Sequence, residues 1–169
     1  MKQAKVLIAR DEGAYHIKVE GRANFDTSPP LRSFANSLDK EGLAGIYVDL
    51  SECVGMDSTF MGVLAMIGLK SKSFGVILTI VNADENCKKL LNGLGLQKIL
   101  AYTEQTKPEN QNWADVLSNA DKTERAQTVL QAHDTLMKVD KDNIPRFKNV
   151  VEFVKKDLEK NDSQNNPNP

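Results

Sequence analysis

Apolar and polar residues near the start of the chain follow a pattern that predicts a β-hairpin and then a helix. Residues 5–9 form a short apolar run, residues 15–20 alternate between apolar and polar types, and the Asp-Glu-Gly sequence at 11–13 has the composition of a turn. Two such runs joined by a short turn are typical of a hairpin. Apolar residues then recur at helical spacing over residues 31–38, and Ser28, followed by two prolines, can cap that helix.

The next stretch predicts a strand followed closely by a helix. Residues 46–50 alternate between apolar and polar types and are rich in the β-branched and aromatic residues that favour a strand. Asp57 or Ser58 can cap the helix that follows, because either side-chain oxygen can accept a hydrogen bond from a backbone N–H of the first turn. A serine at a helix N-terminus lies where backbone donors and the helix dipole favour a negative charge, such as a phosphate. The apolar residues at helical spacing in this helix are Phe60, Val63, Leu64 and Ile67.

Three further elements complete the pattern of the first half. Residues 75–81 are nearly continuously apolar, which is typical of a central strand. Asp84 can cap a helix over residues 86–94, and residues 97–102 predict a last edge strand. The order is β-β-α-β-α-β-α-β, and it predicts an α/β fold in which a mixed β-sheet with parallel pairs is flanked by α-helices.

The second part of the chain is predicted to be a helical hairpin extension. Residues 1–104 form the predicted α/β domain, the polar segment 105–112 predicts a linker, residues 113–160 predict a helical hairpin, and the polar tail 161–169 predicts disorder. An amphipathic hairpin of this kind has to bury its apolar stripe against something. The stripe of its first helix comprises Trp113, Val116, Leu117, Ala120, Val129, Leu130, His133, Leu136 and Met137.

Composition and charge exclude several classes of function. A net charge of −1 and a pI of about 6.1 give no basic field for nucleic acid or an anionic membrane. No run approaches the length of a membrane-spanning helix and no leader pattern precedes the first strand, so we expect a soluble, cytoplasmic protein without membrane insertion. Cys53 and Cys87 have neither metal-site nor disulfide-framework spacing, and we interpret them as buried free thiols.

The sequence contains no constellation that predicts an enzyme, a metal site or a cofactor. Nothing near Ser58 in the sequence can activate it as a nucleophile, and we interpret His16 and His133 as packing or surface residues rather than bases. Asp49 and Asp57 are interpreted as strand-end and cap residues rather than metal ligands. An interaction function therefore fits this sequence better than catalysis.

Residues 1–102 resemble the STAS domain, the fold of bacterial anti-sigma factor antagonists and of the cytosolic part of sulfate transporters. The resemblance is carried by the element order, by Asp-Leu-Ser at 49–51, and by Met-Asp-Ser-Thr at 56–59 before an apolar helix. In the antagonists, the serine after that aspartate is phosphorylated by a partner kinase that is also the anti-sigma factor. The resemblance therefore implies phosphorylation of Ser58, with Thr59 as the second choice.

The resemblance also implies partners and a partner-binding surface. The expected partners are an anti-sigma factor that is a serine kinase-like protein and a phosphatase, with no direct contact to nucleic acid; a homodimer is a further alternative. The expected partner-binding residues are Asn24, Asp26, Asp57, Thr59, Phe60 and Met61.

Two departures from the family pattern leave a second hypothesis open. Phe60 stands where the family usually has glycine, and the loop at 21–27 is closer to STAS proteins of lipid-transport systems. The first hypothesis is a phosphorylation-switched interaction module of a partner-switching pathway. The second is a non-phosphorylated structural STAS subunit of a lipid-transport or signalling complex, and phosphate on Ser58 separates the two.

The helix after Ser58 is apolar nearly all round over residues 59–69. Such a helix is normally buried on more than one side. One side is expected to pack on the sheet, and the other to meet the C-terminal hairpin, a second copy of the chain or a partner protein.

Overall fold

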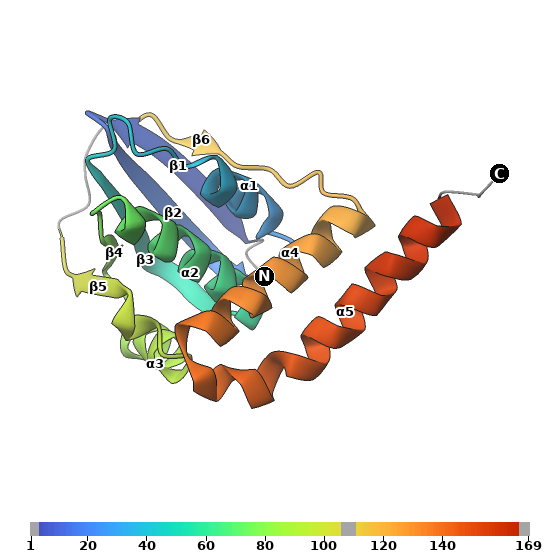
Figure 1. The fold of residues 1–169 in the computed structure, drawn as a ribbon. Helices are drawn as coiled ribbons and strands as arrows, with labels where there is room; N and C mark the ends of the chain where they lie inside the picture. The colour runs from blue at the N-terminus through green and yellow to red at the C-terminus, as the bar shows by residue number, and fades with distance from the viewer. Residues whose placement is uncertain (1–3, 106–110, 166–169) are drawn as a thin grey trace.

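The computed structural model describes residues 4–105 and 111–165 of the 169-residue chain. If one short 3-10 helix is left out, the first eight elements follow the predicted order of strands and helices, as the colours in Figure 1 show. The elements are β1 (Lys5–Asp11), β2 (Ala14–Ala23), α1 (Pro29–Ser37), β3 (Gly45–Met56), α2 (Ser58–Ser73), β4 (Leu78–Val81), α3 (Glu85–Gly93), η1 (Leu96–Lys98), β5 (Leu100–Thr103), β6 (Ala114–Asp115), α4 (Lys122–Val139), η2 (Lys141–Asn143) and α5 (Ile144–Asn165).

The strands form one mixed six-stranded sheet in the order β5-β4-β3-β2-β1-β6. The β1–β2 hairpin is antiparallel, whereas β2–β3, β3–β4 and β4–β5 are parallel, so the predicted mixed sheet with parallel pairs is confirmed. The parallel strands place the end of β3 and the start of α2 at one edge of the sheet. This edge carries Ser58.

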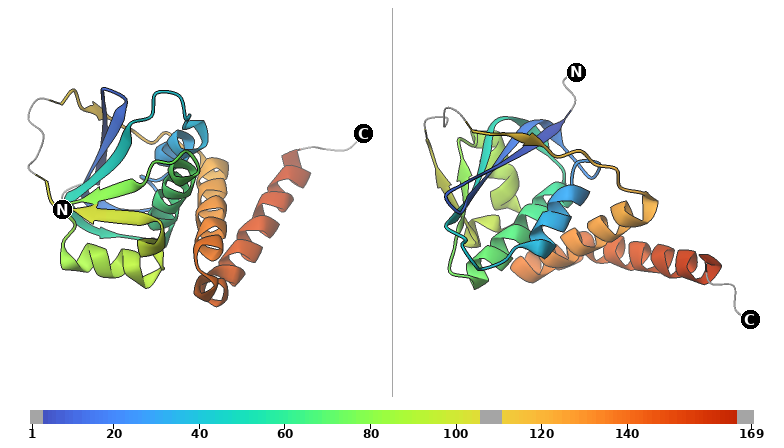
Figure 2. Two further views of the ribbon diagram at one scale, coloured as in Figure 1. Left: turned by 60° about the vertical axis from the view of Figure 1, so that its left-hand side comes forward. Right: turned by 90° about the horizontal axis from the view of Figure 1, so that it is seen from above.

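Helices cover one face of the sheet in successive layers. Figures 1 and 2 show α1 and α2 against the sheet, α4 packed across their outer side, and α5 beyond α4. The side chains of Ile46, Val48 and Leu50 point into the covered face and are buried. On the other face His16 stacks on Tyr47, with 5.2 Å between the ring centroids. The sheet is therefore buried mainly on one side.

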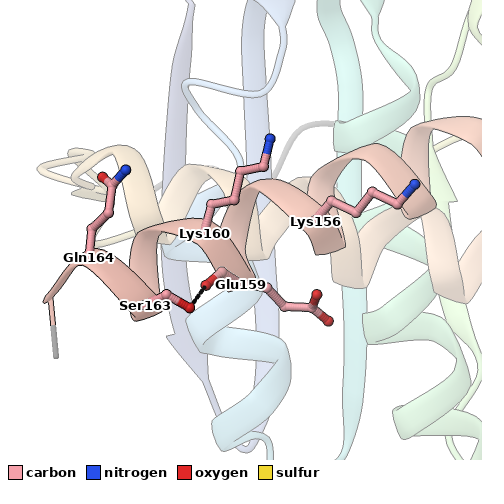
Figure 3. Close-up of a pocket in the computed structure, with 5 residues that line it drawn as sticks. All are labelled: Lys156, Glu159, Lys160, Ser163 and Gln164. Carbon is pink, nitrogen blue, oxygen red and sulfur yellow. Dashed lines mark hydrogen bonds between the residues drawn. The ribbon is translucent and has the colours of Figure 1, made fainter. Parts of the chain in front are cut away.

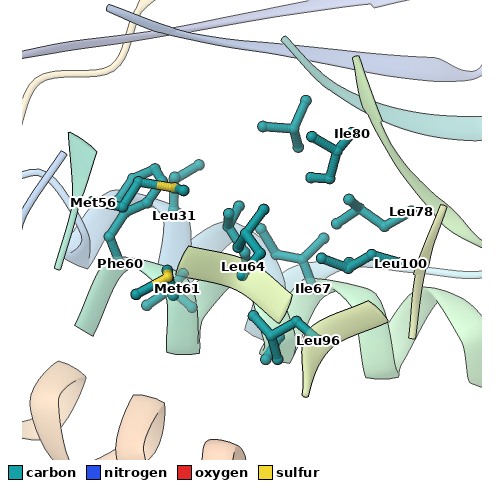
Figure 4. Packing of buried hydrophobic residues seen from close by; sticks show 14 of the residues in the cluster. Leu31, Met56, Phe60, Met61, Leu64, Ile67, Leu78, Ile80, Leu96 and Leu100 are labelled. Atoms are coloured by element: carbon teal, nitrogen blue, oxygen red, sulfur yellow. The ribbon is translucent and has the colours of Figure 1, made fainter. Parts of the chain in front are cut away.

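The core forms around α2, which is buried along most of its length. Figure 4 shows apolar side chains of α2 meeting those of α1, β4, η1 and β5. Ala132 and Leu136 of α4 are fully buried and belong to the same core. Of the three partners expected for the outer side of α2, the structure contains the hairpin, because α4 packs there. Core residues labelled in Figure 4 are Leu31, Met56, Phe60, Met61, Leu64, Ile67, Leu78, Ile80, Leu96 and Leu100.

The segment after residue 112 differs from the prediction, because the helix expected from Trp113 begins only at Lys122. Residues 114–115 instead form β6, which pairs with β1 in antiparallel register, and the N–H of Val116 donates to the carbonyl oxygen of Val6 at 2.9 Å. The edge strand β1 offers unpaired backbone groups, and this segment satisfies them. Helical spacing within the segment was therefore a misleading signal.

Several other boundaries differ from the sequence-based expectation. The strand predicted over 75–81 is limited to β4, and residues 97–98 belong to η1. The helix α5 extends through residue 165, so 161–165 are helical rather than disordered, and the rest of the predicted tail lies outside the described residues. Most of the predicted linker, residues 106–110, also lies outside them. Ser28 precedes α1 but makes no side-chain cap; its hydroxyl donates to the carbonyl oxygen of Asn24 at 2.7 Å.

The two C-terminal helices are anchored differently. The turn between them is tied to the α/β domain by Asn143, whose amide donates to the carbonyl oxygens of Leu94 at 2.9 Å and Leu136 at 2.8 Å. Beyond Val151, which is buried, α5 projects away from the rest of the molecule, as Figure 2 shows, and Phe153 is 73% exposed. The tight contact with the domain is therefore made by α4 and the turn.

Candidate functional site

The loop that leads into α2 is organised by Asp57. Asp57 has an extended backbone, and its Oδ1 accepts a hydrogen bond from the N–H of Phe60 at 2.8 Å, which makes it the N-cap of α2. Its Oδ2 accepts from the N–H of Phe25 at 2.8 Å, and its own N–H donates to the carbonyl oxygen of Ala23 at 3.1 Å. One carboxylate therefore satisfies an orphan helix donor and holds the β2–α1 loop beside the helix start.

Ser58 is the first residue of α2, and its hydroxyl is bonded to a histidine of α4. The Oγ of Ser58 lies 2.8 Å from Nε2 of His133, and Nδ1 of His133 lies 2.7 Å from the carbonyl oxygen of Val129. A carbonyl can only accept, so Nδ1 carries the hydrogen and Nε2 of the neutral ring accepts from the Ser58 hydroxyl. The structure thus brings together two residues that are 75 positions apart.

His133 is enclosed by the elements around it. It is 4% exposed, and its ring packs edge-to-face on Phe147 of α5 at a centroid distance of 4.8 Å. Burial lowers the pKa of His133 from its usual 6.5, and this effect exceeds the opposing contributions of the Val129 carbonyl and the negative charge of Asp57. The site therefore favours the neutral imidazole that the hydrogen bond from Ser58 requires.

The other residues predicted to bind a partner fall into two groups. Asn24 and Asp26 lie in the β2–α1 loop, and a carboxylate oxygen of Asp26 lies 3.8 Å from the guanidinium of Arg125 on α4. Phe60 is 0% exposed and Met61 5% exposed. These two side chains lie in the core and, contrary to the expectation, offer no surface to a partner in this conformation. The bulky side chain at position 60 instead fills the core beneath the helix start. Thr59 is similarly buried.

Comparison with known proteins identifies the first part of the chain. A family model described as the STAS domain matches residues 5–110. The chain belongs to the STAS domain family. Within this STAS domain, the end of β3 and the start of α2 carry the Asp57–Ser58 pair. No curated protein matches the sequence.

The fold is shared with a solved structure at low sequence identity. The structure of the anti-sigma factor antagonist SpoIIAA in its unphosphorylated form is similar with a TM-score of 0.52 and 13% identity, over 62% of this chain and 91% of SpoIIAA. A candidate anti-sigma factor antagonist from Thermotoga maritima is similar with a TM-score of 0.49 and 17% identity, over 59% of this chain and 86% of the other. The matched part of the family model ends at residue 110, so α4 and α5 lie beyond it.

His133 is the residue of this site that sequence reasoning did not connect with Ser58. It belongs to α4, outside the STAS match, and no local pattern links it to Ser58. The only sequence signal is a histidine within an apolar helical stripe, since a buried polar group needs a hydrogen-bond partner. That signal indicates that a partner exists, but it does not identify the partner as Ser58.

Two of the surface hollows lie away from the Ser58–His133 pair. One, of about 650 Å³, lies between β1, the β2–α1 loop and the segment after β6, and its lining includes Asn24 and Asp26. The other lies along the end of α5 and is shown in Figure 3. It is lined by Lys156, Glu159, Lys160, Ser163 and Gln164, all from one helix, so it has no opposite wall to enclose a ligand.

The described residues provide neither a metal site nor a membrane-spanning helix. In the part of the chain that the structure describes, no three His, Cys, Asp or Glu residues are grouped to hold a metal ion. None of the described helices combines the length and the apolar character needed to cross a bilayer. Cys53 and Cys87 are buried free thiols, and Sγ of Cys87 lies 3.8 Å from the carbonyl oxygen of Cys53.

Acidification is expected to weaken the docking of α4. The folded-state pKa of His133 lies below the usual 6.5, so the stabilisation by the neutral ring is fully present above about pH 6.5 and is lost as the pH falls below it. As the pH falls below about 6.5, the melting temperature of the parent should therefore decrease more than that of His133→Gln. His16→Gln, on the opposite face of the sheet, is the control for replacing a histidine outside α4. Equal pH dependence in the parent and His133→Gln would contradict this role of His133.

Proposed function

We propose that this protein is a regulatory protein-interaction module of a bacterial partner-switching pathway, of the anti-sigma factor antagonist kind, controlled by phosphorylation of Ser58. The observation that carries the proposal is the position of Ser58 in a STAS domain, as the first residue of α2 directly after the capping Asp57. The free N–H groups and the dipole of a helix N-terminus favour a phosphate there.

Phosphorylation at this position changes the charge of the surface around the helix start. A serine kinase transfers the γ-phosphoryl group of a nucleoside triphosphate, so that the Oγ–P bond of Ser58 forms and the bond to the leaving nucleoside diphosphate breaks. The hydroxyl proton passes to a base of the kinase. The phosphate adds about −1.5 to −2 charges at pH 7 next to Asp57. An acidic partner surface is then repelled, and an apolar one would have to desolvate the new charge, so binding is lost. A phosphatase restores binding by hydrolysing the ester.

The partner in this scheme is an anti-sigma factor that is also a serine kinase-like protein. It would bind the loop beside the start of α2, where Asn24 and Asp26 line an open hollow and Phe25 is 44% exposed. Asp57 holds this loop against the helix through the N–H of Phe25. A charge change at Ser58 therefore occurs next to the side chains that a partner can reach.

Phosphate is expected on Ser58, or failing that on Thr59, in protein purified from its own cells with phosphatases inhibited. Mass spectrometry of the peptide that contains both residues measures it. Ser58→Ala should abolish the main phosphopeptide. The control Ser51→Ala, at an exposed position on β3, should retain it. Absence of phosphate from both residues in every growth condition would contradict the proposal.

A second candidate function is a non-phosphorylated structural STAS subunit of a lipid-transport or signalling complex. The observation that favours it is the hydrogen bond from Ser58 to the buried His133, which gives the hydroxyl a structural role. Capture of partners from a native lysate separates the two functions. The phosphorylation switch predicts that Ser58→Asp loses a partner that the parent captures, whereas a structural subunit captures the same partners with both.

A further inference from the structure

We propose that α4 is an intramolecular lid over Ser58, so that a kinase reaches this serine only when α4 has left its docked position. The inference rests on the proposed function, because it concerns how phosphorylation of Ser58 is regulated. It concerns a part of this chain that lies beyond the residues that match the STAS domain.

The first observation is that the Ser58 hydroxyl is already engaged by α4. Its Oγ lies 2.8 Å from Nε2 of His133, which is itself buried and packed on Phe147. Phosphoryl transfer requires the incoming phosphorus to approach Oγ with the attacking and leaving oxygens roughly in line. A buried imidazole on one side of Oγ excludes a kinase active site from that side. Release of α4 removes both the hydrogen bond and the obstruction.

The second observation is the close approach of the two helices next to Ser58. A Cβ atom added at Gly62 would lie 2.5 Å from the carbonyl oxygen and 2.7 Å from the Cβ of Ala132. Gly62 is one helical turn after Ser58 and therefore lies on the same face of α2. The absence of a side chain at position 62 thus lets α4 approach α2 closely enough for His133 to reach Ser58.

The third observation is that polar contacts at the surface hold α4 along its length. Arg125 pairs with Asp26 of the β2–α1 loop, and the Gln131 amide donates to Oδ1 of Asn36 on α1 at 3.0 Å. Past the end of the helix, Asp140 pairs with Lys98 at 2.9 Å. Exposed pairs of this kind contribute little each. Opening of the lid has to break these pairs together with the buried contacts of Ala132 and Leu136 in the core around α2, and α4 makes all of them from beyond the STAS match.

Docking of α4 and phosphorylation of Ser58 then oppose each other. The docked lid hinders phosphorylation, and a phosphate on Ser58 in turn disfavours the docked position of α4. There are two physical causes. A phosphate on Oγ of Ser58 would occupy the position that the His133 ring has when α4 is docked. The docked helix would also bury the charge of the phosphate away from water.

Thiol labelling of a Ser58→Cys variant of the full chain tests the lid without knowledge of the kinase. The native Cys53 and Cys87 are 4% and 0% exposed, so the reaction of the parent provides a low background. Adding Gly62→Ala should raise the rate of labelling by Ellman's reagent on the order of tenfold, equivalent to about 1.4 kcal/mol of docking free energy. Alanine also favours helix more than glycine does, so α2 itself is not weakened. The matched control is Gly93→Ala, where an added Cβ meets nothing within 4 Å.

A second variant disrupts the same contact from the α4 side. Ala132→Glu places a charge at a fully buried position of α4, outside the residues that match the STAS domain. It should raise the labelling rate of the Ser58→Cys chain as Gly62→Ala does, while Gln127→Glu, at an exposed position of α4, should not. Labelling that remains at the control rate in both Gly62→Ala and Ala132→Glu overturns the lid.

The phosphate content of Ser58 in the native cell separates failure of the lid from failure of the proposed function. With Ser58 intact, Gly62→Ala should carry more phosphate than Gly93→Ala. Equal, measurable phosphate in both overturns the lid, because the kinase then reaches Ser58 whether or not α4 is docked. Faster labelling in Gly62→Ala with no phosphate in any variant supports the lid and contradicts the proposed function.

Discussion

Replacing Phe60 with alanine is expected to lower the free energy of unfolding by about 3 to 5 kcal/mol. Phe60 is 0% exposed and belongs to the core cluster around α2. Its removal leaves a cavity at the first turn of that helix, where Asp57 has already fixed the backbone by accepting from the Phe60 N–H. The surroundings can therefore collapse only partly. Urea unfolding followed by circular dichroism measures the change.

The chain offers a matched control for this substitution. Phe153 on α5 is 73% exposed, and Phe153→Ala should change the free energy of unfolding by no more than about 0.5 kcal/mol. If Phe60→Ala changes the free energy of unfolding as little as Phe153→Ala does, the Phe60 side chain is not buried in the core. Phe60 would then be free to act as the exposed partner-binding residue that the family resemblance implies.

The second large effect is expected from Asn143→Asp, which should destabilise the docked hairpin by about 2 to 5 kcal/mol. Asn143 is 1% exposed, and its amide nitrogen donates to two carbonyl oxygens, one of Leu94 and one of Leu136. A carboxylate has no donor, so both carbonyls lose their partner and face a buried negative charge. Hydrogen–deuterium exchange of α4 measures the loss of docking.

The pH response provides a further check on Asn143→Asp. Protonation of the new carboxyl restores one donor, so the loss should be smaller at low pH than at pH 7. Asn149→Asp, at an exposed position on α5, introduces the same charge and should leave the exchange of α4 unchanged. Equal exchange in the two variants would show that Asn143 does not hold the turn.

The extension beyond the STAS domain is thus part of the same core rather than an appended module. Ala132 and Leu136 pack with residues of α2, and Asn143 ties the following turn to the end of α3. In a STAS domain without this extension, the corresponding face of α2 would lack that cover. A partner that binds the part of α2 covered by Ala132 and Leu136 would have to displace α4.

Local sequence patterns predicted the order of the elements well because the interactions that define them are local. The alternation of apolar and polar residues predicted β2 and β3. Asp57 and Asp84 were predicted as helix caps, and the structure confirms this because their side chains accept hydrogen bonds from the N–H groups of Phe60 and Cys87. The phosphate-compatible position of Ser58 followed from the same argument. Family resemblance then identified the fold, and the match to the STAS domain confirms it.

The sequence by itself determined that Ser58 stands at the start of α2, because a cap and its helix are a few residues apart. Only the tertiary structure decided that β6 completes the sheet beside β1 and that His133 accepts from Ser58, 75 residues away. An open strand edge or a histidine in an apolar stripe shows that a hydrogen-bonding group elsewhere in the chain is needed. By sequence alone, many distant segments could supply that group equally well. The choice among them depends on packing, here on the close approach of α4 to α2 at Gly62, which no local pattern encodes.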